Sequence, residues 1–182
     1  MLARVDTEVT GDERARMATW RDLRTDRPDL ADAGRELLYQ FGGGLAFLGT
    51  VRPDGGPRLH PICPLCADDR LFAFLVPSPK RDDLGRDPRY ALHSFPCAES
   101  EDAFYLRGEA RVRDDDGLRT QLIDQFLAER SQLALNADEL IDQGLFELDI
   151  DTCLLTRTDG HGDPKPRHTV WHAEPDVSRP SR

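Results

Sequence analysis

The chain lacks any long apolar segment. None of its 182 residues falls in an apolar run that approaches the roughly 18 residues of a membrane-spanning helix. The first ten residues, Met1 to Thr10, also lack the apolar centre of a secretory signal peptide. We therefore expect a cytoplasmic protein that makes no contact with a membrane.

Positive charge is scarce. Lys and Arg together number 24 against 34 for Asp and Glu, so the formal net charge is −10. An acidic chain is repelled by the phosphate backbone, which argues against sequence-independent binding of nucleic acid. Any site for a phosphate group must therefore be a local basic pocket.

The chain has only four cysteines. In a reducing compartment these are expected to be free thiols. Cys63 and Cys66 form a Cys-x-x-Cys motif, and His93 with Cys97 supplies enough ligands for zinc on spacing alone. A predicted strand and helix separate the two pairs, however, and no thioredoxin-like pattern surrounds the motif. We therefore predict neither a metal site nor a redox dithiol.

Common nucleotide- and calcium-binding motifs are missing. No Gly-x-Gly-x-x-Gly follows a predicted strand, which excludes the usual dinucleotide fold. The glycine run 42–44 lacks a following Lys-Ser or Lys-Thr, so it is not a P-loop. Asp114 to Asp116 lacks the spacing of a calcium loop and is predicted to be a solvated turn.

Many short apolar segments separated by turns favour strands over helices. Few helices lie between these segments, which is typical of a mainly β (α+β) fold in which an antiparallel barrel carries flanking helices. We expect a single domain over residues 1–182, with a helical extension at 12–40, the barrel at 44–172 and a flexible tail at 173–182. The predicted helices are 12–24, 28–40, 118–130 and 137–143, and the predicted strands are 45–51, 57–65, 71–76, 90–95, 102–113, 145–150, 153–158 and 167–172.

A further short helix is predicted between Ser78 and Pro88. Ser78 suits the N-cap and Pro79 the first helical position. Lys80 and Arg81 then lie at the positive end of the helix dipole, which disfavours cations. Their position is explained if an anion shares the site with the free backbone N–H groups, and that anion can be a phosphate. The alternative is that both side chains extend into solvent.

The segment 58–65 carries two prolines, Pro61 and Pro64, which cannot donate hydrogen bonds within a sheet. This predicts an edge or an opening of the sheet. A planar heteroaromatic ring could lie along such a backbone while its phosphate reaches Ser78, Lys80 and Arg81. An ordinary edge strand whose prolines prevent aggregation is the alternative.

Three segments in a fixed order resemble the pyridoxamine 5'-phosphate oxidase-like family. They are the stretch from Gly49 to Pro61, the tripeptide Ser78-Pro79-Lys80, and the stretch from Asp87 to Leu92, so the resemblance covers roughly residues 44–113. It implies a six-stranded antiparallel split barrel that binds flavin. It also implies a homodimer, with FMN or a deazaflavin coenzyme in a groove between the subunits.

Site residues follow from the resemblance position by position. The phosphate-contacting Ser and Lys of the family fall on Ser78 and Lys80, and Phe74 would flank the ribityl chain. The strand that contacts the ring falls on His60, Pro61, Ile62 and Cys63.

The chain departs from the authentic oxidase at several positions. That enzyme has arginine at the positions of His60 and Pro79 in this chain. It has lysine at the position of Leu65. We expect Arg58 and Arg81 to supply the missing charge. The C-terminal motif that holds pyridoxal in the oxidase is not found in 167–172, so we do not expect the vitamin-pathway oxidase itself.

We therefore expect an FMN-binding oxidoreductase that transfers hydride to or from an unidentified small molecule. No catalytic residue is assigned, although His60 could serve as a proton donor. One alternative is a deazaflavin-dependent reductase of the same fold, with Arg81, Arg86 and Arg89 along the longer anionic tail. The other is a non-catalytic protein that binds or stores flavin or haem.

Overall fold

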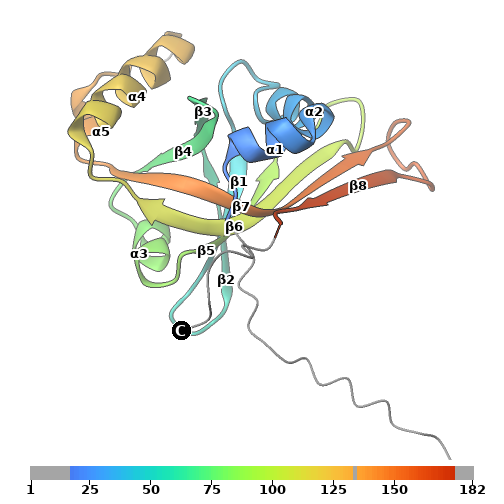
Figure 1. Cartoon of the computed structure of the whole chain (residues 1–182), viewed down its shortest axis with the longest axis horizontal. Helices are drawn as coiled ribbons and strands as arrows, with labels where there is room; N and C mark the ends of the chain where they lie inside the picture. Colours follow the sequence, from blue (N-terminus) through green and yellow to red (C-terminus); the bar gives the residue numbers. More distant parts are fainter. Residues whose placement is uncertain (1–16, 133–134, 175–182) are drawn as a thin grey trace, which may run out of the picture.

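A computed structural model describes residues 17–132 and 135–174 of the chain. In these ranges the chain folds into a curved antiparallel sheet flanked by helices (Figure 1). The helices are α1 (Trp20–Asp26), α2 (Pro28–Leu38), α3 (Pro79–Arg86), α4 (Asp116–Glu129) and α5 (Asp138–Ile141). The strands are β1 (Ala46–Val51), β2 (Pro57–Ile62), β3 (Pro64–Ala67), β4 (Arg70–Leu75), β5 (Arg89–Ser94), β6 (Ala103–Val112), β7 (Gly144–Arg157) and β8 (Arg167–His172).

The sheet curves until its two ends meet. Its strand order is β2-β1-β5-β6-β7-β4-β3, so β2 and β3 lie at opposite ends of the order. In the chain, however, only Cys63 separates β2 from β3. The two ends are therefore joined covalently, which gives the split barrel expected from the sequence.

The strand count differs from the six that the resemblance implied. The described residues form eight strands, because the predicted strand 57–65 is divided at Cys63 and because β8 lies outside the main path and pairs with β7. The β7–β8 hairpin extends away from the barrel on the side opposite α4 and α5 (Figure 1).

The strand β7 is continuous, whereas the sequence predicted two strands at 145–150 and 153–158. A β-bulge opposite β6 absorbs the irregularity, since Arg107 pairs with Thr152 while the next residue, Gly108, pairs with Ile150. A Cβ on Gly108 would lie 1.9 Å from the carbonyl oxygen of Asp149, so only glycine fits this close approach. The pattern of apolar residues contained no signal for the bulge.

The N-terminal helices lie near their predicted positions. Thr19 and Asp22 form a capping box at the start of α1, which ends at Asp26 rather than at residue 24. Both helices pack on the main core, where a Cβ on Gly34 would lie 2.3 Å from the Phe104 ring. Residues 12–16 of the predicted first helix lie outside the described residues.

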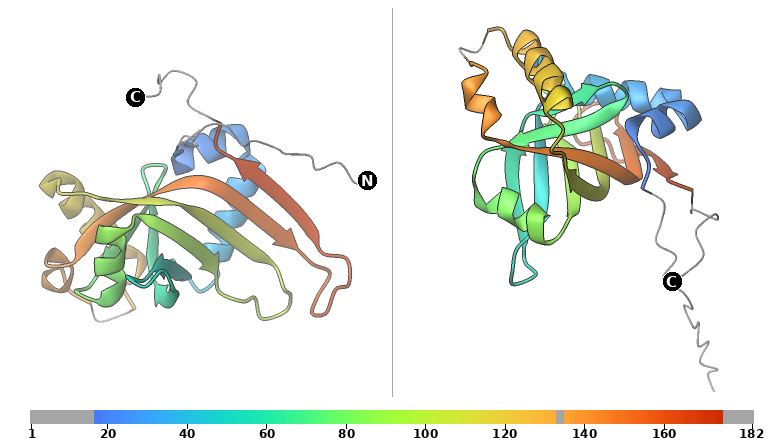
Figure 2. Two further views of the ribbon diagram at one scale, coloured as in Figure 1. Left: turned by 90° about the horizontal axis from the view of Figure 1, so that it is seen from below. Right: turned by 60° about the vertical axis from the view of Figure 1, so that its left-hand side comes forward.

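The barrel has a second, smaller core on its outer face. The helix α4 covers β3 and β4 there with Leu122, Ile123 and Phe126 (Figure 2). Just beyond α4, the buried Arg130 donates to the carbonyl oxygens of Gly44 and Pro64 at 3.2 and 3.1 Å. The end of α4 is thereby tied to the junction between β2 and β3.

The sequence assigned residues 173–182 to a flexible tail. Ala173 is buried and its N–H donates to the carbonyl oxygen of Asp151 at 2.9 Å, so residue 173 belongs to the folded part. Residues 175–182 of the predicted tail lie outside the described residues. Among the helices in the described part of the chain, none has the length and apolar character needed to span a bilayer.

Candidate functional site

The short helix α3 begins as the sequence predicted. Ser78 occupies the N-cap with extended backbone angles, and Pro79 is the first helical residue. The Ser78 hydroxyl does not cap the helix, however, because it donates to the carbonyl oxygen of Val76 at 2.8 Å. The first turn closes instead through the Ser78 carbonyl oxygen, which accepts from the N–H groups of Arg81 and Asp82.

The first turn of α3 carries two cations, Lys80 and Arg81. Within the described residues, neither Lys80 nor Arg81 takes part in an ion pair or a side-chain hydrogen bond, and both are half-buried. The side chain of Arg81 lies across the start of β7, where a Cβ on Gly144 would come within 3.0 Å of its Cδ. By contrast, Arg86 in the last turn of the same helix is paired with Asp83.

The buried face of α3 carries a carboxylate, that of Asp83. Asp83 accepts hydrogen bonds from Arg58 Nε at 2.6 Å, from Thr50 Oγ1 at 3.0 Å and from Arg86 at 3.3 Å. Burial disfavours the charged form, but the hydrogen bonds from Arg58, Thr50 and Arg86 outweigh it and hold the pKa of Asp83 below its ordinary value. Arg58, predicted to contact the cofactor, is therefore already engaged with a residue of its own chain.

The sequence analysis did not identify Asp83 as an important residue. Asp83 and Arg58 are 25 residues apart, and no local pattern reports such a contact.

The strand β2 divides the predicted ring-binding residues between two faces. His60 and Ile62 lie opposite Leu48 and Ala46 of β1, whose side chains are buried in the barrel. Ile62 is likewise buried in the main core, His60 is half-buried, and Pro61 on the other face is exposed. The register therefore separates Pro61 from its two neighbours, because successive side chains of a strand point to opposite faces.

Two further predicted residues belong to the second core. Phe74 is only 8% exposed and meets Phe126 of α4 edge to face, with ring centroids 5.7 Å apart. Cys63 packs against the same cluster. The structure thus brings Ser78, Lys80 and Arg81 together on one short helix, whereas Phe74 and Cys63 lie under α4.

In the Cys-x-x-Cys motif, Cys66 lies in β3 and Cys63 is the residue that joins β2 to β3. Three residues of strand span about 10 Å, which exceeds the roughly 7 Å that a disulfide allows between Cα atoms. Cys63 faces the second core and Cys66 the main core, and both are free thiols. Burial raises the pKa of Cys66 to about 12. Within the described residues, no group of three or more potential metal ligands is found.

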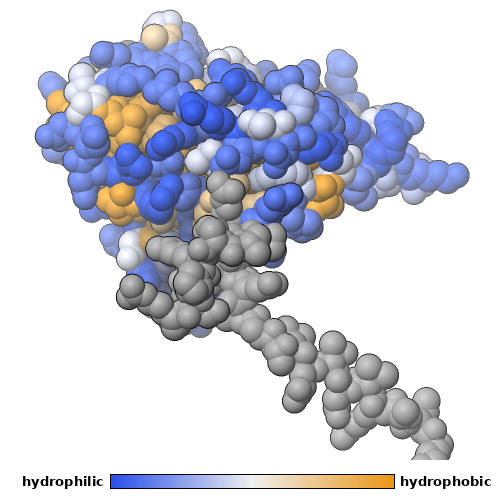
Figure 3. Space-filling model, in the orientation of Figure 1, coloured by the Kyte–Doolittle hydropathy of each residue, from blue (hydrophilic) through white to orange (hydrophobic). Residues whose placement is uncertain are grey.

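Apolar surface gathers near the two unpartnered cations. The strands β4 and β6 pair with the start of β7 on its two sides. Val76, just after β4, is 46% exposed, and Val112, the last residue of β6, is 55% exposed. Ile141, just before β7, is 52% exposed. The space-filling view shows apolar areas on this side, over α3, α4 and α5, while the rest of the visible face is mainly polar (Figure 3).

Comparisons with known proteins show the fold. No protein-family model and no curated protein matches the chain. Among solved structures, HutZ, the heme storage protein from Vibrio cholerae, is 15% identical with a TM-score of 0.54, over 80% of this chain and 93% of HutZ.

Two further solved structures have similar scores. A candidate pyridoxamine 5'-phosphate oxidase from Listeria innocua is 13% identical with a TM-score of 0.54, over 68% of this chain and 95% of that one. A heme binding protein from Mycobacterium smegmatis is 17% identical with a TM-score of 0.55, over 78% of this chain but only 57% of its own. The chain thus has the split-barrel fold found in pyridoxamine 5'-phosphate oxidase-like proteins.

Proposed function

We propose that the protein binds FMN, with the phosphate at the first turn of α3 and the isoalloxazine ring along the edge strand β2. One observation carries the proposal. Lys80 and Arg81 are adjacent and unpartnered among the described residues, in a chain with a net charge of −10 whose described arginines are mostly ion-paired. A phosphate dianion would satisfy both cations and would accept from the backbone N–H of Lys80, because Pro79 has no N–H and those of Arg81 and Asp82 already donate to the Ser78 carbonyl oxygen.

The residues at this site fit a phosphate better than a longer anionic tail. The sequence offered Arg86 and Arg89 as further contacts for a deazaflavin coenzyme. In the structure Arg86 donates to Asp83 and to the carbonyl oxygen of Val51, and Arg89 is held by Asp87. Because both guanidinium groups already have partners, the cationic surface ends near Arg81, which favours FMN over the deazaflavin.

The predicted ring contacts then take different roles. His60 and Pro61 remain available at the edge of β2, since His60 is half-buried and Pro61 exposed. Ile62, Cys63 and Phe74 would support the strand from within the two cores. Arg58 would act through Asp83 of α3, because their ion pair attaches α3 to β2.

When bound, the flavin would supply the hydride chemistry. The chain's own residues would anchor the phosphate, orient the ring along β2 and limit access of water. His60 lies on β2 and is half-buried, so we propose it as the hydrogen-bond partner of the ring. This supports an oxidoreductase, whose substrate would enter beside His60.

We also propose a homodimer in which a second copy closes the groove. Val76, Val112 and Ile141 leave apolar surface exposed next to the phosphate site. Covering that surface would bury the cofactor between two subunits and remove the apolar side chains from water.

A binding experiment tests the cofactor. The purified chain is mixed with FMN, passed over a desalting column, and examined for flavin absorption and for a change in molecular mass. We expect retention of FMN by a dimer and bleaching on addition of a nicotinamide reductant. Loss of all flavin on the column would contradict the proposal.

Haem binding is the second candidate, because two structural neighbours are described as heme-binding or heme storage proteins. His60 would be the candidate ligand, since it is the half-buried histidine on the proposed ring strand. Titration with hemin distinguishes the two. A Soret band that shifts in His60→Ala, together with no retention of FMN, would favour haem.

A further inference from the structure

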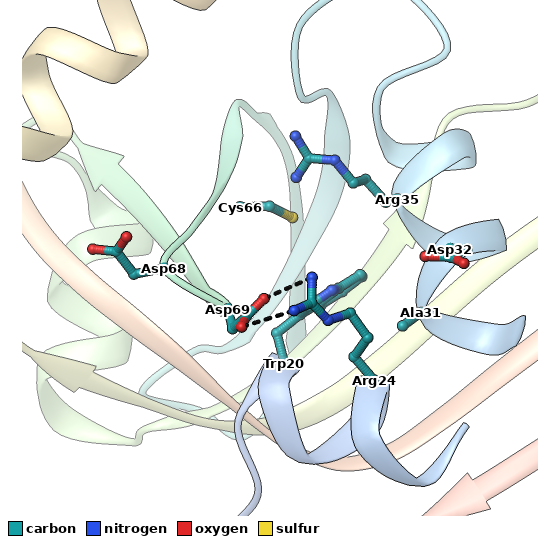
Figure 4. A pocket seen from close by; sticks show the side chains of 8 residues that line it. All are labelled: Trp20, Arg24, Ala31, Asp32, Arg35, Cys66, Asp68 and Asp69. Atoms are coloured by element: carbon teal, nitrogen blue, oxygen red, sulfur yellow. Dashed lines mark hydrogen bonds and ion pairs between the residues drawn. The ribbon is translucent and has the colours of Figure 1, made fainter. Parts of the chain in front are cut away.

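A separate cavity of about 210 Å³ lies between the N-terminal helices and the turn that joins β3 to β4 (Figure 4). It is distinct from the α3 site in its residues, since α1 contributes Trp20 and Arg24 and α2 contributes Ala31, Asp32 and Arg35. Cys66 of β3 and the two aspartates of the turn complete its wall.

The inner part of the cavity is apolar. Trp20, Ala31 and Cys66 are 4%, 1% and 6% exposed, so they belong to the buried wall rather than to the mouth. The Cys66 thiol is uncharged at neutral pH because burial raises its pKa to about 12. An apolar group of a ligand would therefore meet uncharged side chains at this wall, beside the Arg35 guanidinium, which lies close to Cys66.

The aspartates of the turn already have partners. Asp69 forms an ion pair with Arg24 at 2.9 Å, and Asp68 accepts from Gln121 of α4 at 2.7 Å. Both aspartates have positive φ, 47° and 59°, which non-glycine residues rarely adopt. Contacts from α1 and α4 thus hold a strained turn in place at the rim.

Two charges of opposite sign remain available at the same rim. Arg35 lies over the Tyr39 ring at 4.6 Å and extends toward Cys66, but it has no carboxylate partner in the described part of the chain. Asp32 has no ion pair or hydrogen bond among the described residues. They are three positions apart on α2, so they are neighbours on the helix surface, yet they do not pair with each other.

We propose that this cavity binds a small zwitterion of the amino-acid class, with its carboxylate on Arg35, its ammonium group on Asp32 and an apolar side chain against Trp20, Ala31 and Cys66. The balance of charge excludes a dianion such as phosphate, because the lining holds three aspartates against two arginines. The volume of the cavity is large enough for a small amino acid, since a cavity of about 150 Å³ accommodates benzene and this one is about 210 Å³.

Three probes of one shape test the proposal by calorimetry on the full chain. L-Leucine carries both charges, isocaproate lacks the ammonium group, and isopentylamine lacks the carboxylate. We expect leucine to bind at least about tenfold more tightly than either analogue, because each lost charge leaves a charge-assisted hydrogen bond unmade.

Two variants assign the charges. In Arg35→Gln, leucine should bind no better than isopentylamine, whose own binding should not change. In Asp32→Asn, leucine should bind no better than isocaproate, whose binding should not change. Lys165→Gln, a charge change at an exposed residue outside the cavity lining, should leave all three affinities unaltered.

The outcomes are decisive in both directions. If leucine does not bind at millimolar concentration, or if it binds Arg35→Gln and Asp32→Asn as tightly as the natural chain, the proposal is wrong. Thermal unfolding checks that the variants are folded. If Arg35→Gln does not fold, Asp32→Asn alone decides, since Asp32 is exposed and its side chain forms no hydrogen bond or ion pair with the described residues. FMN plays no part in these measurements, so their result is independent of the proposed function.

Discussion

Arg58 and Asp83 form an ion pair across 25 residues of sequence, with Nε and Oδ2 2.6 Å apart. The Asp83 side chain is 3% exposed and that of Arg58 25%. This contact attaches α3 to the edge strand β2, so it holds the first turn of α3, with Lys80 and Arg81, at the edge of the barrel.

Replacing the buried carboxylate should destabilise the protein. In Asp83→Asn the Arg58 guanidinium loses its counter-charge, and we expect a loss of about 2 to 4 kcal/mol in the free energy of unfolding, measured with urea. The neighbouring Asp82→Asn is a matched control on an exposed side chain and should change stability by less than about 0.5 kcal/mol. Equal effects of the two substitutions would contradict the role of Asp83.

The same pair predicts a dependence on pH. The folded-state pKa of Asp83 lies below the ordinary value of 3.8, so its stabilisation is complete above pH 3.8 and is lost as the pH falls through the lower, folded-state pKa. The difference in unfolding free energy between the natural chain and Asp83→Asn should therefore shrink on acidification. Asp87, whose pKa the hydrogen bond from Arg89 lowers to about 2, titrates in both proteins and cancels in this difference. A difference that stays constant down to the acid transition would be evidence against the assigned shift.

Lys80→Ala tests the phosphate site. We expect FMN to bind about 1.5 to 3 kcal/mol more weakly, because a charge-assisted hydrogen bond to phosphate is lost. The matched control is Lys165→Ala, which removes the same side chain at an exposed position between β7 and β8. Fluorescence titration with FMN measures both. Identical affinities in the two variants would exclude Lys80 from the site.

Two helical glycines should respond to alanine in opposite ways. Gly34→Ala forces a Cβ against the Phe104 ring, 2.3 Å away, and should destabilise the fold by about 1 to 3 kcal/mol. Gly85→Ala on α3 meets nothing within 4 Å and should stabilise it by about 0.4 to 1 kcal/mol. Chemical unfolding of each variant gives the sign directly, and a stabilising Gly34→Ala would show that α2 does not pack closely on β6.

The cysteines should differ in reactivity. Burial raises the pKa of both Cys66 and Cys153 to about 12, and only the thiolate reacts with iodoacetamide. We expect these two thiols to remain unmodified in the folded protein and to react after unfolding in guanidinium, as mass spectrometry can show. Mild oxidation should produce no disulfide between Cys63 and Cys66. A cross-linked peptide would mean that the chain between them is not extended in solution.

Local signals were sufficient for most elements but not for their environment. Ser78 and Pro79 predicted the start of α3, because N-cap and first-turn preferences depend only on neighbouring residues. Short apolar segments between turns likewise predicted β5, β6 and β8 to within one or two residues. The division of the strand at Cys63 and the bulge at Gly108 were missed, since both arise where distant segments meet.

The amino-acid sequence by itself determined that the chain is acidic, that two adjacent cations stand at a helix start, and that one predicted edge strand is rich in proline. Only the tertiary structure decided which charged groups stay available, because pairing depends on residues brought together from separate segments. Arg58 is bound by Asp83, and Arg86 and Arg89 have carboxylate partners, whereas Lys80 and Arg81 have none in the described part of the chain. The availability of a charge thus depends on its neighbours in space, which a linear pattern does not contain.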